Sequence, residues 1–195
     1  VVAAGAILHY LSDAHHNKIP HITSIRSIFE EEYVWMDRFT IRNLELFQST
    51  NPNGVALIDV LDKTLTAMGG RMLKHWLAFP ERNLSKIEER LDLVEALTKD
   101  DSIKDKMANH LSEIVDIERI VAKIATQKIS PRALVQLGKS LDQITEIKVD
   151  LLDHPSTKLK TLGGGFLDAS EVIKLIKSTL KSEAPVLLGK GEVIA

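Results

Sequence analysis

The sequence contains no cysteine, only six prolines and few aromatic residues. The absence of cysteine excludes disulfides and thiolate metal sites, and it fits a reducing compartment. No apolar run approaches the ~20 residues that a membrane-spanning helix needs. Neither sign of charge dominates, because 25 basic and 27 acidic side chains give a formal net charge of −2. This balance excludes a general electrostatic attraction to nucleic acid or to an anionic membrane.

Helix-forming residues are what the sequence does contain. Hydrophobic residues make up 44% and charged residues 27% of the 195 positions, which is typical of a globular protein. After Val55 the apolar residues recur at steps of three and four almost without pause, and this spacing predicts successive amphipathic helices. Because each apolar stripe must be buried against another, we expect a mainly α fold, a multi-helix bundle with one or two short strands.

The segment from Asp62 to Pro80 is predicted to form one amphipathic helix. Gly69 and Gly70 stand in the middle of it, where each glycine costs a helix about 1 kcal/mol relative to alanine. They indicate either a close approach of another backbone or a kinked or split helix. Met72 and Trp76 are expected to anchor this helix in the bundle. The residues that share its apolar face are Leu65, Met68, Met72, Trp76 and Phe79.

Local signals place the other elements. The β-branched and aromatic run Tyr33–Met36 is the best strand candidate. Ser130 followed by Pro131 predicts the start of a long helix that ends near Asp153, since a capping hydroxyl precedes a proline at the first helical position. Residues 163–165 are predicted to be a hinge or loop, and residues 186–194 a short hairpin. The apolar stripes predicted to be buried are Ile87, Leu91, Val94 and Leu97, then Ile103, Met107, Leu111 and Ile114, then Ile117, Ile120, Val121 and Ile124.

Motifs for chemistry are absent or incomplete. Gly138-Lys139-Ser140 lacks the earlier glycine of a phosphate-binding loop and lies inside a helical pattern. No nucleophile and general base occur at a spacing that would bring them together, so the chain is predicted to be non-catalytic. One group remains as a candidate for a weak phosphate contact, the basic stripe of Lys174, Lys177 and Lys181. The histidines that cluster in the sequence, His9, His15, His16 and His21, lack the spacing of a metal site, so they are predicted to be solvated and no metal site is expected.

Several ordered segments resemble the MutS family of DNA mismatch-repair proteins. Met36–Leu46 is similar to the family's Asp-x-x-Thr-x-Arg-Asn-Leu-Glu-Leu block, although Arg38, Phe39 and Ile41 depart from its usual residues. Leu57–Pro80 resembles the block that contains Met-Gly-x-Arg and Trp-Leu. Further matches follow in order at 87–94, 116–120 and 185–195, and 1–11 resembles the end of the preceding domain. The signature residues are Asp37, Thr40, Asn43, Leu44, Glu45, Leu46, Asp62, Thr64, Met68, Gly69, Arg71 and Trp76.

The resemblance implies a division of the chain and a role for it. Residues 1–20 would be the tail of the connector domain, and residues 21–195 the first half of the helical lever, or core, domain, ending where the clamp would begin. The chain would then be a piece of a longer protein. The lever would couple the mismatch-binding domains to an ATPase without catalysing a reaction. No cofactor is expected in this segment, and ATP and Mg would bind elsewhere in the whole protein.

The resemblance also implies partners and a location. They are mismatched double-stranded DNA, a second MutS copy and a MutL-type protein, in the nucleoid-associated cytoplasm of a bacterium and with no membrane. Three alternatives stay open at this point. The chain could be the lever of a MutS paralogue that acts in recombination, an unrelated helical scaffold for protein partners, or a metal enzyme that uses the N-terminal histidines.

Overall fold

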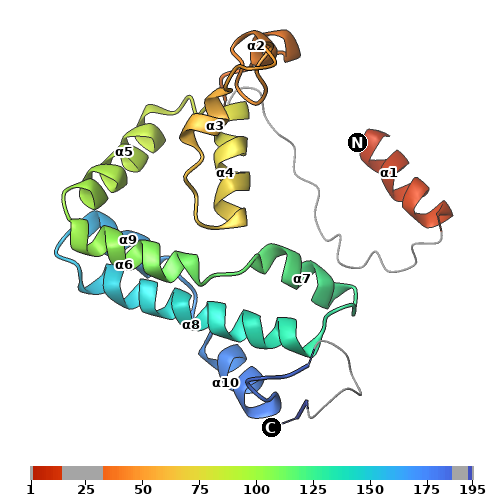
Figure 1. The fold of residues 1–195 in the computed structure, drawn as a ribbon, viewed down its shortest axis with the longest axis vertical. Helices are drawn as coiled ribbons and strands as arrows, with labels where there is room; N and C mark the ends of the chain where they lie inside the picture. Colours follow the sequence, from red (N-terminus) through yellow and green to blue (C-terminus); the bar gives the residue numbers. More distant parts are fainter. Residues whose placement is uncertain (1, 15–32, 186–192, 195) are drawn as a thin grey trace.

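The computed structural model describes residues 2–14, 33–185 and 193–194. These residues are mainly helical, as predicted, and Figure 1 shows the arrangement. The helices are α1 (Val2–Asp13), α2 (Arg38–Asn43), α3 (Leu57–Leu61), α4 (Ala67–Ala78), α5 (Leu84–Thr98), α6 (Asp101–Ser112), α7 (Ile117–Ala125), α8 (Pro131–Asp153), α9 (Thr157–Gly164) and α10 (Ser170–Thr179).

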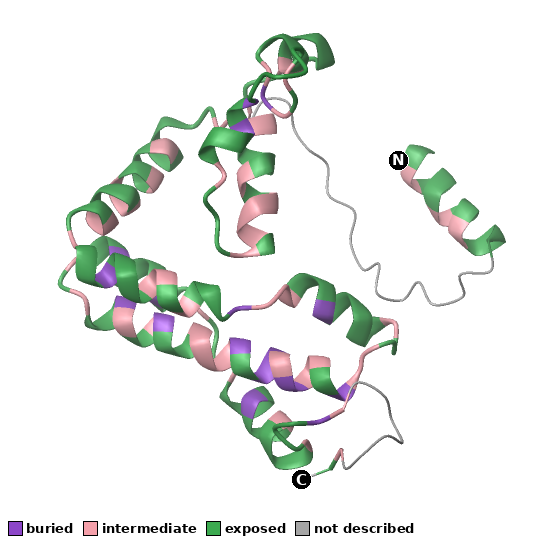
Figure 2. Cartoon of the chain, in the orientation of Figure 1, coloured by how far each residue is buried: buried purple, intermediate pink, exposed green. Residues whose placement is uncertain are grey.

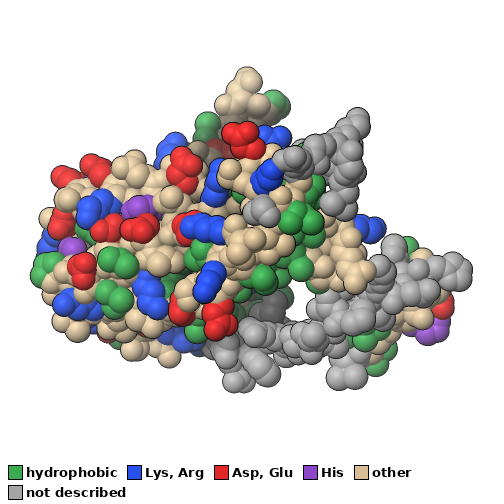
Figure 3. Space-filling model, turned by 90° about the horizontal axis from the view of Figure 1, so that it is seen from below, with side chains coloured by type: hydrophobic (Ala, Val, Ile, Leu, Met, Phe, Trp, Pro, Cys, Tyr) green, Lys and Arg blue, Asp and Glu red, His purple; other side chains and the backbone are tan. Residues whose placement is uncertain are grey.

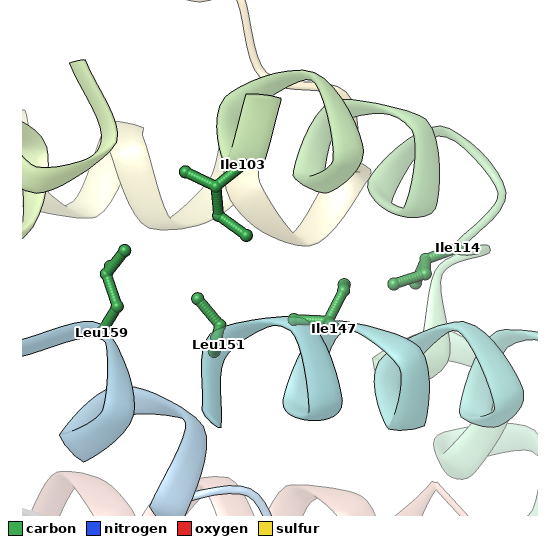
Figure 4. Close-up of a cluster of buried hydrophobic side chains, with 5 residues drawn as sticks. All are labelled: Ile103, Ile114, Ile147, Leu151 and Leu159. Atoms are coloured by element: carbon green, nitrogen blue, oxygen red, sulfur yellow. The ribbon is translucent and has the colours of Figure 1, made fainter. Parts of the chain in front are cut away.

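The long helix α8 is the centre of the bundle. It packs against α6, α7, α9 and α10, and α5 in turn packs against α6 and α9. Figure 2 shows that buried residues gather along α8 and on the faces that its neighbours turn toward it. The main cluster joins α6, the α6–α7 connection, α8 and α9, and Figure 4 shows its side chains pointing toward one another. Its members are Ile103, Ile114, Ile147, Leu151 and Leu159.

Side-chain caps explain where most helices begin. Ser130 Oγ accepts a hydrogen bond from the Ala133 amide at 3.3 Å, and Pro131 occupies the first helical position of α8 as predicted. Asn83 caps α5 by accepting from the Lys86 amide. Asp37, Thr66, Asp100 and Asp116 cap α2, α4, α6 and α7 in the same way. Each cap satisfies an amide that would otherwise lack a partner in the first helical turn.

The prediction of a single helix from Asp62 to Pro80 is wrong at its start. Thr66 caps α4 by accepting from the Gly69 amide at 3.0 Å, so both glycines lie in the first turn and not in the middle. A Cβ on Gly69 would lie 3.0 Å from Thr66 Oγ1, and one on Gly70 would lie 3.2 Å from Thr64 Oγ1. The close approach therefore comes from threonine side chains of the preceding turn, not from another helix.

The predicted anchors of α4 are also wrong. Met72 and Trp76 are 56% and 42% exposed, whereas Met68 packs against the main cluster. On α5, Leu91 and Val94 were also predicted to be buried but are exposed, whereas Leu93 and Leu97 pack against the main cluster. Three further residues of the predicted stripes are exposed, namely Leu111, Val121 and Ile124. Helical spacing identified these stripes, but the neighbouring helices decide which edge of a stripe is covered.

The predicted strands reduce to two isolated bridges in the described part of the chain. Tyr33 pairs with Glu81, and Leu180 pairs with Ile194. The Val34 amide donates to the Pro80 carbonyl at 2.8 Å, but Pro80 has no amide hydrogen to return, so the ladder cannot continue. Most of the predicted hairpin, residues 186–192, lies outside the described residues.

Residues 163–165 do not form a hinge. Gly163 and Gly164 complete α9, a helix that the sequence pattern did not predict, and Gly163 is buried against α8. A Cβ on Gly163 would lie 2.9 Å from Leu151 Cβ and 3.3 Å from the Leu152 backbone nitrogen. Glycine is therefore required here by the close contact between α8 and α9.

Candidate functional site

The phosphate-loop resemblance at Gly138-Lys139-Ser140 is explained by packing inside α8. A Cβ on Gly138 would lie 3.1 Å from Ile176 Cγ2, so glycine lets α10 approach. Ser140 is fully buried and its hydroxyl accepts from the Val115 amide at 3.1 Å. Both residues therefore serve the bundle, in agreement with the helical pattern.

A junction between α4 and the start of α7 is the most elaborate polar contact of the described chain. Arg71 Nη1 and Nη2 donate to the two carboxylate oxygens of Asp116 at 2.8 and 2.7 Å. Arg71 Nε also donates to Glu118 Oε2 at 2.9 Å. A guanidinium matches carboxylates in this two-pronged way, which fixes direction as well as distance. We call Arg71, Asp116 and Glu118 the arginine junction.

The arginine junction places α4 relative to the bundle. Figure 1 shows the N-terminal end of α4 pointing at the connection between α6 and α7. Met68, one turn before Arg71, packs against the main cluster, so α4 enters the bundle through one apolar and one charged contact. Two signature residues, and not Met72 or Trp76, therefore attach α4.

The electrostatics of the arginine junction favour the ionised pair. The hydrogen bond from Arg71 lowers the pKa of Asp116 from 3.8 to about 2, and the Arg119 amide and charge act in the same direction. Asp116 and then Glu118 raise the pKa of Arg71 above its usual range. Only 18% of the Asp116 side chain is exposed, against 40% for Arg71 and 67% for Glu118, so the Asp116 contact is the better shielded.

Acid is expected to remove the contribution of Asp116 to stability. Because its pKa is lower in the folded chain, the contribution is complete above the unfolded pKa of 3.8 and disappears as the pH falls toward 2. The variant Asp116→Asn keeps the helix cap but loses the charge. In urea unfolding, its midpoint should lie below that of the wild type at pH 7, and the difference should vanish near pH 2. A constant difference would contradict this assignment.

The signature residues of Met36–Leu46 make structural contacts, which include backbone hydrogen bonds to the start of α3. Asp37 accepts from the Thr40 amide at 2.7 Å, and the pKa of Asp37 is lowered by that bond. Asn43 ends α2 and Leu44 is its C-cap, 56% exposed. The carbonyls of Glu45 and Leu46 accept from the Leu57 and Ile58 amides, both at 3.0 Å. Glu45 adopts a left-handed backbone, with φ of 49°, and its carboxylate accepts from the Thr50 amide at 2.7 Å.

The remaining signature residues support α4. Thr64 donates to Asp62 Oδ1 at 2.6 Å, and this bond is the largest cause of the lowered pKa of Asp62. Trp76 lies under the Arg90 guanidinium, whose carbon is 4.1 Å from the ring centroid. Both contacts are structural, since neither brings together a nucleophile and a base.

The three lysines of the predicted phosphate contact do not form one row on α10. Lys174 and Lys177 lie in α10, and Lys181 follows its end. Lys177 Nζ lies 2.8 Å from Asp142 Oδ2 on α8, and Lys174 lines a hollow that also contains Asp142. Figure 3 shows basic and acidic side chains intermixed on this face of the molecule. Phosphate binding here stays a prediction, weakened by the adjacent carboxylate.

Of the four clustered histidines, only His9 is among the residues that the structure describes. His15, His16 and His21 lie outside the described residues, and His9 pairs with Asp13 at 2.9 Å. Among the residues that the structure describes, no group of three metal-ligating side chains occurs. His110 contacts Gln143 and Asp150. No described helix is both long and apolar enough to cross a bilayer.

Known proteins are similar in sequence to this chain over its whole length. The family model for MutS domain III matches residues 39–195. The chain is 49% identical over 195 residues to the DNA mismatch repair protein MutS of Flavobacterium psychrophilum. The MutS proteins of Flavobacterium johnsoniae and Christiangramia forsetii are 47% and 46% identical. The whole chain is covered in each match, and it spans 22% of the length of each relative.

These matches confirm the resemblance seen in the signature blocks and exclude an unrelated helical scaffold. The boundary at residue 20 between a connector tail and the next domain stays a prediction, because the family model begins at residue 39. The arginine junction connects two blocks of that matched region. The chain belongs to the MutS family of DNA mismatch-repair proteins, and residues 39–195 are its domain III.

Proposed function

We propose that this chain is the non-catalytic lever segment of a MutS-type DNA mismatch-repair ATPase. Its task is to carry movement between the parts that bind mismatched DNA and the part that hydrolyses ATP. The observation that carries the proposal is the arginine junction, which joins α4 to the start of α7 across 45 residues of sequence. A lever needs such a contact, because a bidentate ion pair fixes the direction as well as the distance between the two elements that it joins.

The bundle has the shape that this task requires. α8 runs through 23 residues and is packed along its length by α6, α7, α9 and α10. A packed core resists continuous deformation, so a displacement at one end of α8 is transmitted as a rigid-body shift. Movement of α4 would enter this body through Met68 and Arg71.

The other parts of the activity belong to the whole protein in this proposal. ATP and Mg bind outside the chain, and the segment itself holds no cofactor. The partners are mismatched double-stranded DNA, a second MutS copy and a MutL-type protein, in the bacterial cytoplasm. Mismatch repair is preferred over a recombination paralogue because the relatives at 46–49% identity carry the mismatch-repair name.

Loss of the arginine junction is expected to uncouple ATP hydrolysis from DNA binding in the whole protein. Arg71→Met keeps the aliphatic stem but removes all the hydrogen bonds to Asp116 and Glu118. The stimulation of ATP hydrolysis by mismatched DNA should fall by about fivefold or more. The basal ATPase rate and the affinity for mismatched DNA without nucleotide should stay near wild-type values.

A matched control separates coupling from charge loss. Lys104 pairs with Asp101 within α6, so Lys104→Met removes an ion pair that joins no two helices. This variant should retain the full stimulation by mismatched DNA. If Arg71→Met also retained it, or lost basal hydrolysis and DNA affinity together with it, the lever assignment of the junction would be wrong.

A further inference from the structure

Three helix ends meet at His154, where α8 gives way to α9. His154 is the C-cap of α8, and only 11% of its side chain is exposed. Its Nε2 lies 3.2 Å from Asp100 Oδ2, and its Nδ1 lies 3.0 Å from the backbone nitrogen of Ser156. Asp100 is the N-cap of α6, and Ser156 is the N-cap of α9. One imidazole therefore connects the ends of α6, α8 and α9.

The two contacts decide which ring nitrogen carries hydrogen. A backbone N–H can only donate, so Nδ1 must offer its lone pair to Ser156. Nε2 then carries the hydrogen and donates to the Asp100 carboxylate. The neutral ring with hydrogen on Nε2 satisfies both partners. If Nδ1 were protonated as well, its N–H would face the backbone N–H of Ser156, and no hydrogen bond could form between them.

Charged residues of α6 and α8 make up the electrostatic environment of His154. Asp100 faces the ring from α6, and its pKa is lowered first by the Ile103 amide and then by the bond to His154. Asp153 precedes His154 on α8, and Lys106 of α6 interacts with both Asp100 and Asp153. The Asp100 carboxylate and the Ser156 N–H face opposite nitrogens of the same ring, and the Ser156 N–H can only donate.

We propose that His154 is a proton-controlled connector between α8 and α9. Its neutral form holds the ends of α6 and α9 together. A proton taken from solvent at Nδ1 breaks the bond from Ser156 and leaves the charged ring paired with Asp100. Because α9 carries Leu159 and Gly163 against α8, release of its first turn loosens the contact that closes the main cluster.

His110 on the same interface supplies an internal contrast. Its Nδ1 lies 2.6 Å from Gln143 Oε1, and its Nε2 lies 3.3 Å from Asp150 Oδ2, so both nitrogens face oxygen atoms. A doubly protonated ring can donate to both. At His154, by contrast, Nδ1 faces a backbone N–H that can only donate.

The test is an NMR experiment on the ¹⁵N-labelled chain. Long-range ¹H–¹⁵N correlations report which nitrogen of His154 is protonated, and hydrogen exchange reports the protection factor of the Ser156 amide. At neutral pH, Nδ1 should be unprotonated and Ser156 protected. As the His154 ring titrates, the protection factor should fall about tenfold. A protonated Nδ1 at neutral pH, or a protection factor unchanged through the titration, would overturn the proposal.

Matched variants isolate the acceptor from the donor. His154→Asn offers a carbonyl oxygen that accepts from the amide two residues on and does not titrate, so Ser156 should stay protected at every pH. His154→Gln presents a donor toward Asp100 without the near acceptor, so Ser156 should be unprotected at every pH. His110→Gln should leave the pH dependence at Ser156 as in the wild type. If Ser156 were protected in His154→Gln and unprotected in His154→Asn, the proposal would also be contradicted.

Discussion

Replacing Leu159 with alanine is expected to lower the free energy of unfolding by about 2–5 kcal/mol. Leu159 is fully buried and lies in the main cluster with Leu151 and Ile103. Truncation removes apolar contact and leaves a cavity between α6, α8 and α9, which rigid helices cannot fill completely. Urea unfolding followed by circular dichroism at pH 7 measures the change.

Leu162 provides the control on the same helix. Its side chain is 41% exposed, so Leu162→Ala makes the same chemical change without opening an internal cavity. We expect a loss of about 1 kcal/mol or less. Equal losses for Leu159→Ala and Leu162→Ala would show that α9 is not seated on α8 through Leu159.

Gly163→Ala is expected to destabilise the chain by about 1–3 kcal/mol, although alanine is the better helix former. The new methyl group would lie 2.9 Å from Leu151 Cβ and 3.3 Å from the Leu152 backbone nitrogen. Neither neighbour is the free end of a flexible side chain, so α9 must move away from α8. The urea midpoint should fall, and the slope of the transition should stay the same.

The adjacent glycine separates packing from backbone propensity. A Cβ on Gly164 would meet no atom within 4 Å, and this residue also lies in α9. Gly164→Ala should therefore be neutral or stabilising by about 0.5–1 kcal/mol. If both variants were stabilising, the close contact between α8 and α9 would be refuted.

Local signals predicted the helices whose ends are marked by their own residues. Ser130 and Pro131 begin α8, and Pro80 ends the segment of α4, because capping and the missing proline amide act within a few residues. The signature residues also identified the family without any tertiary information. In contrast, α9 was not predicted, since eight residues ending in glycines resemble a loop when the packing partner is unknown.

The long-range residue contacts described above could not be predicted from the sequence. Arg71 is a signature residue and Asp116 lies in the matched segment 116–120, but nothing in their spacing indicated that they touch across 45 positions. The same holds for His154 with Asp100, where 54 residues separate the partners. Such contacts depend on how helices cross, and the helical period contains no information about crossing.

The sequence by itself determined the helical class, the family and the helix boundaries that carry their own caps, because these depend on residue type and short-range spacing. The tertiary structure decided which edge of each apolar stripe is buried, why Gly163 must be glycine, and which charges meet in the arginine junction. Burial and ion pairing are properties of two surfaces, and only the assembled bundle brings the second surface into place.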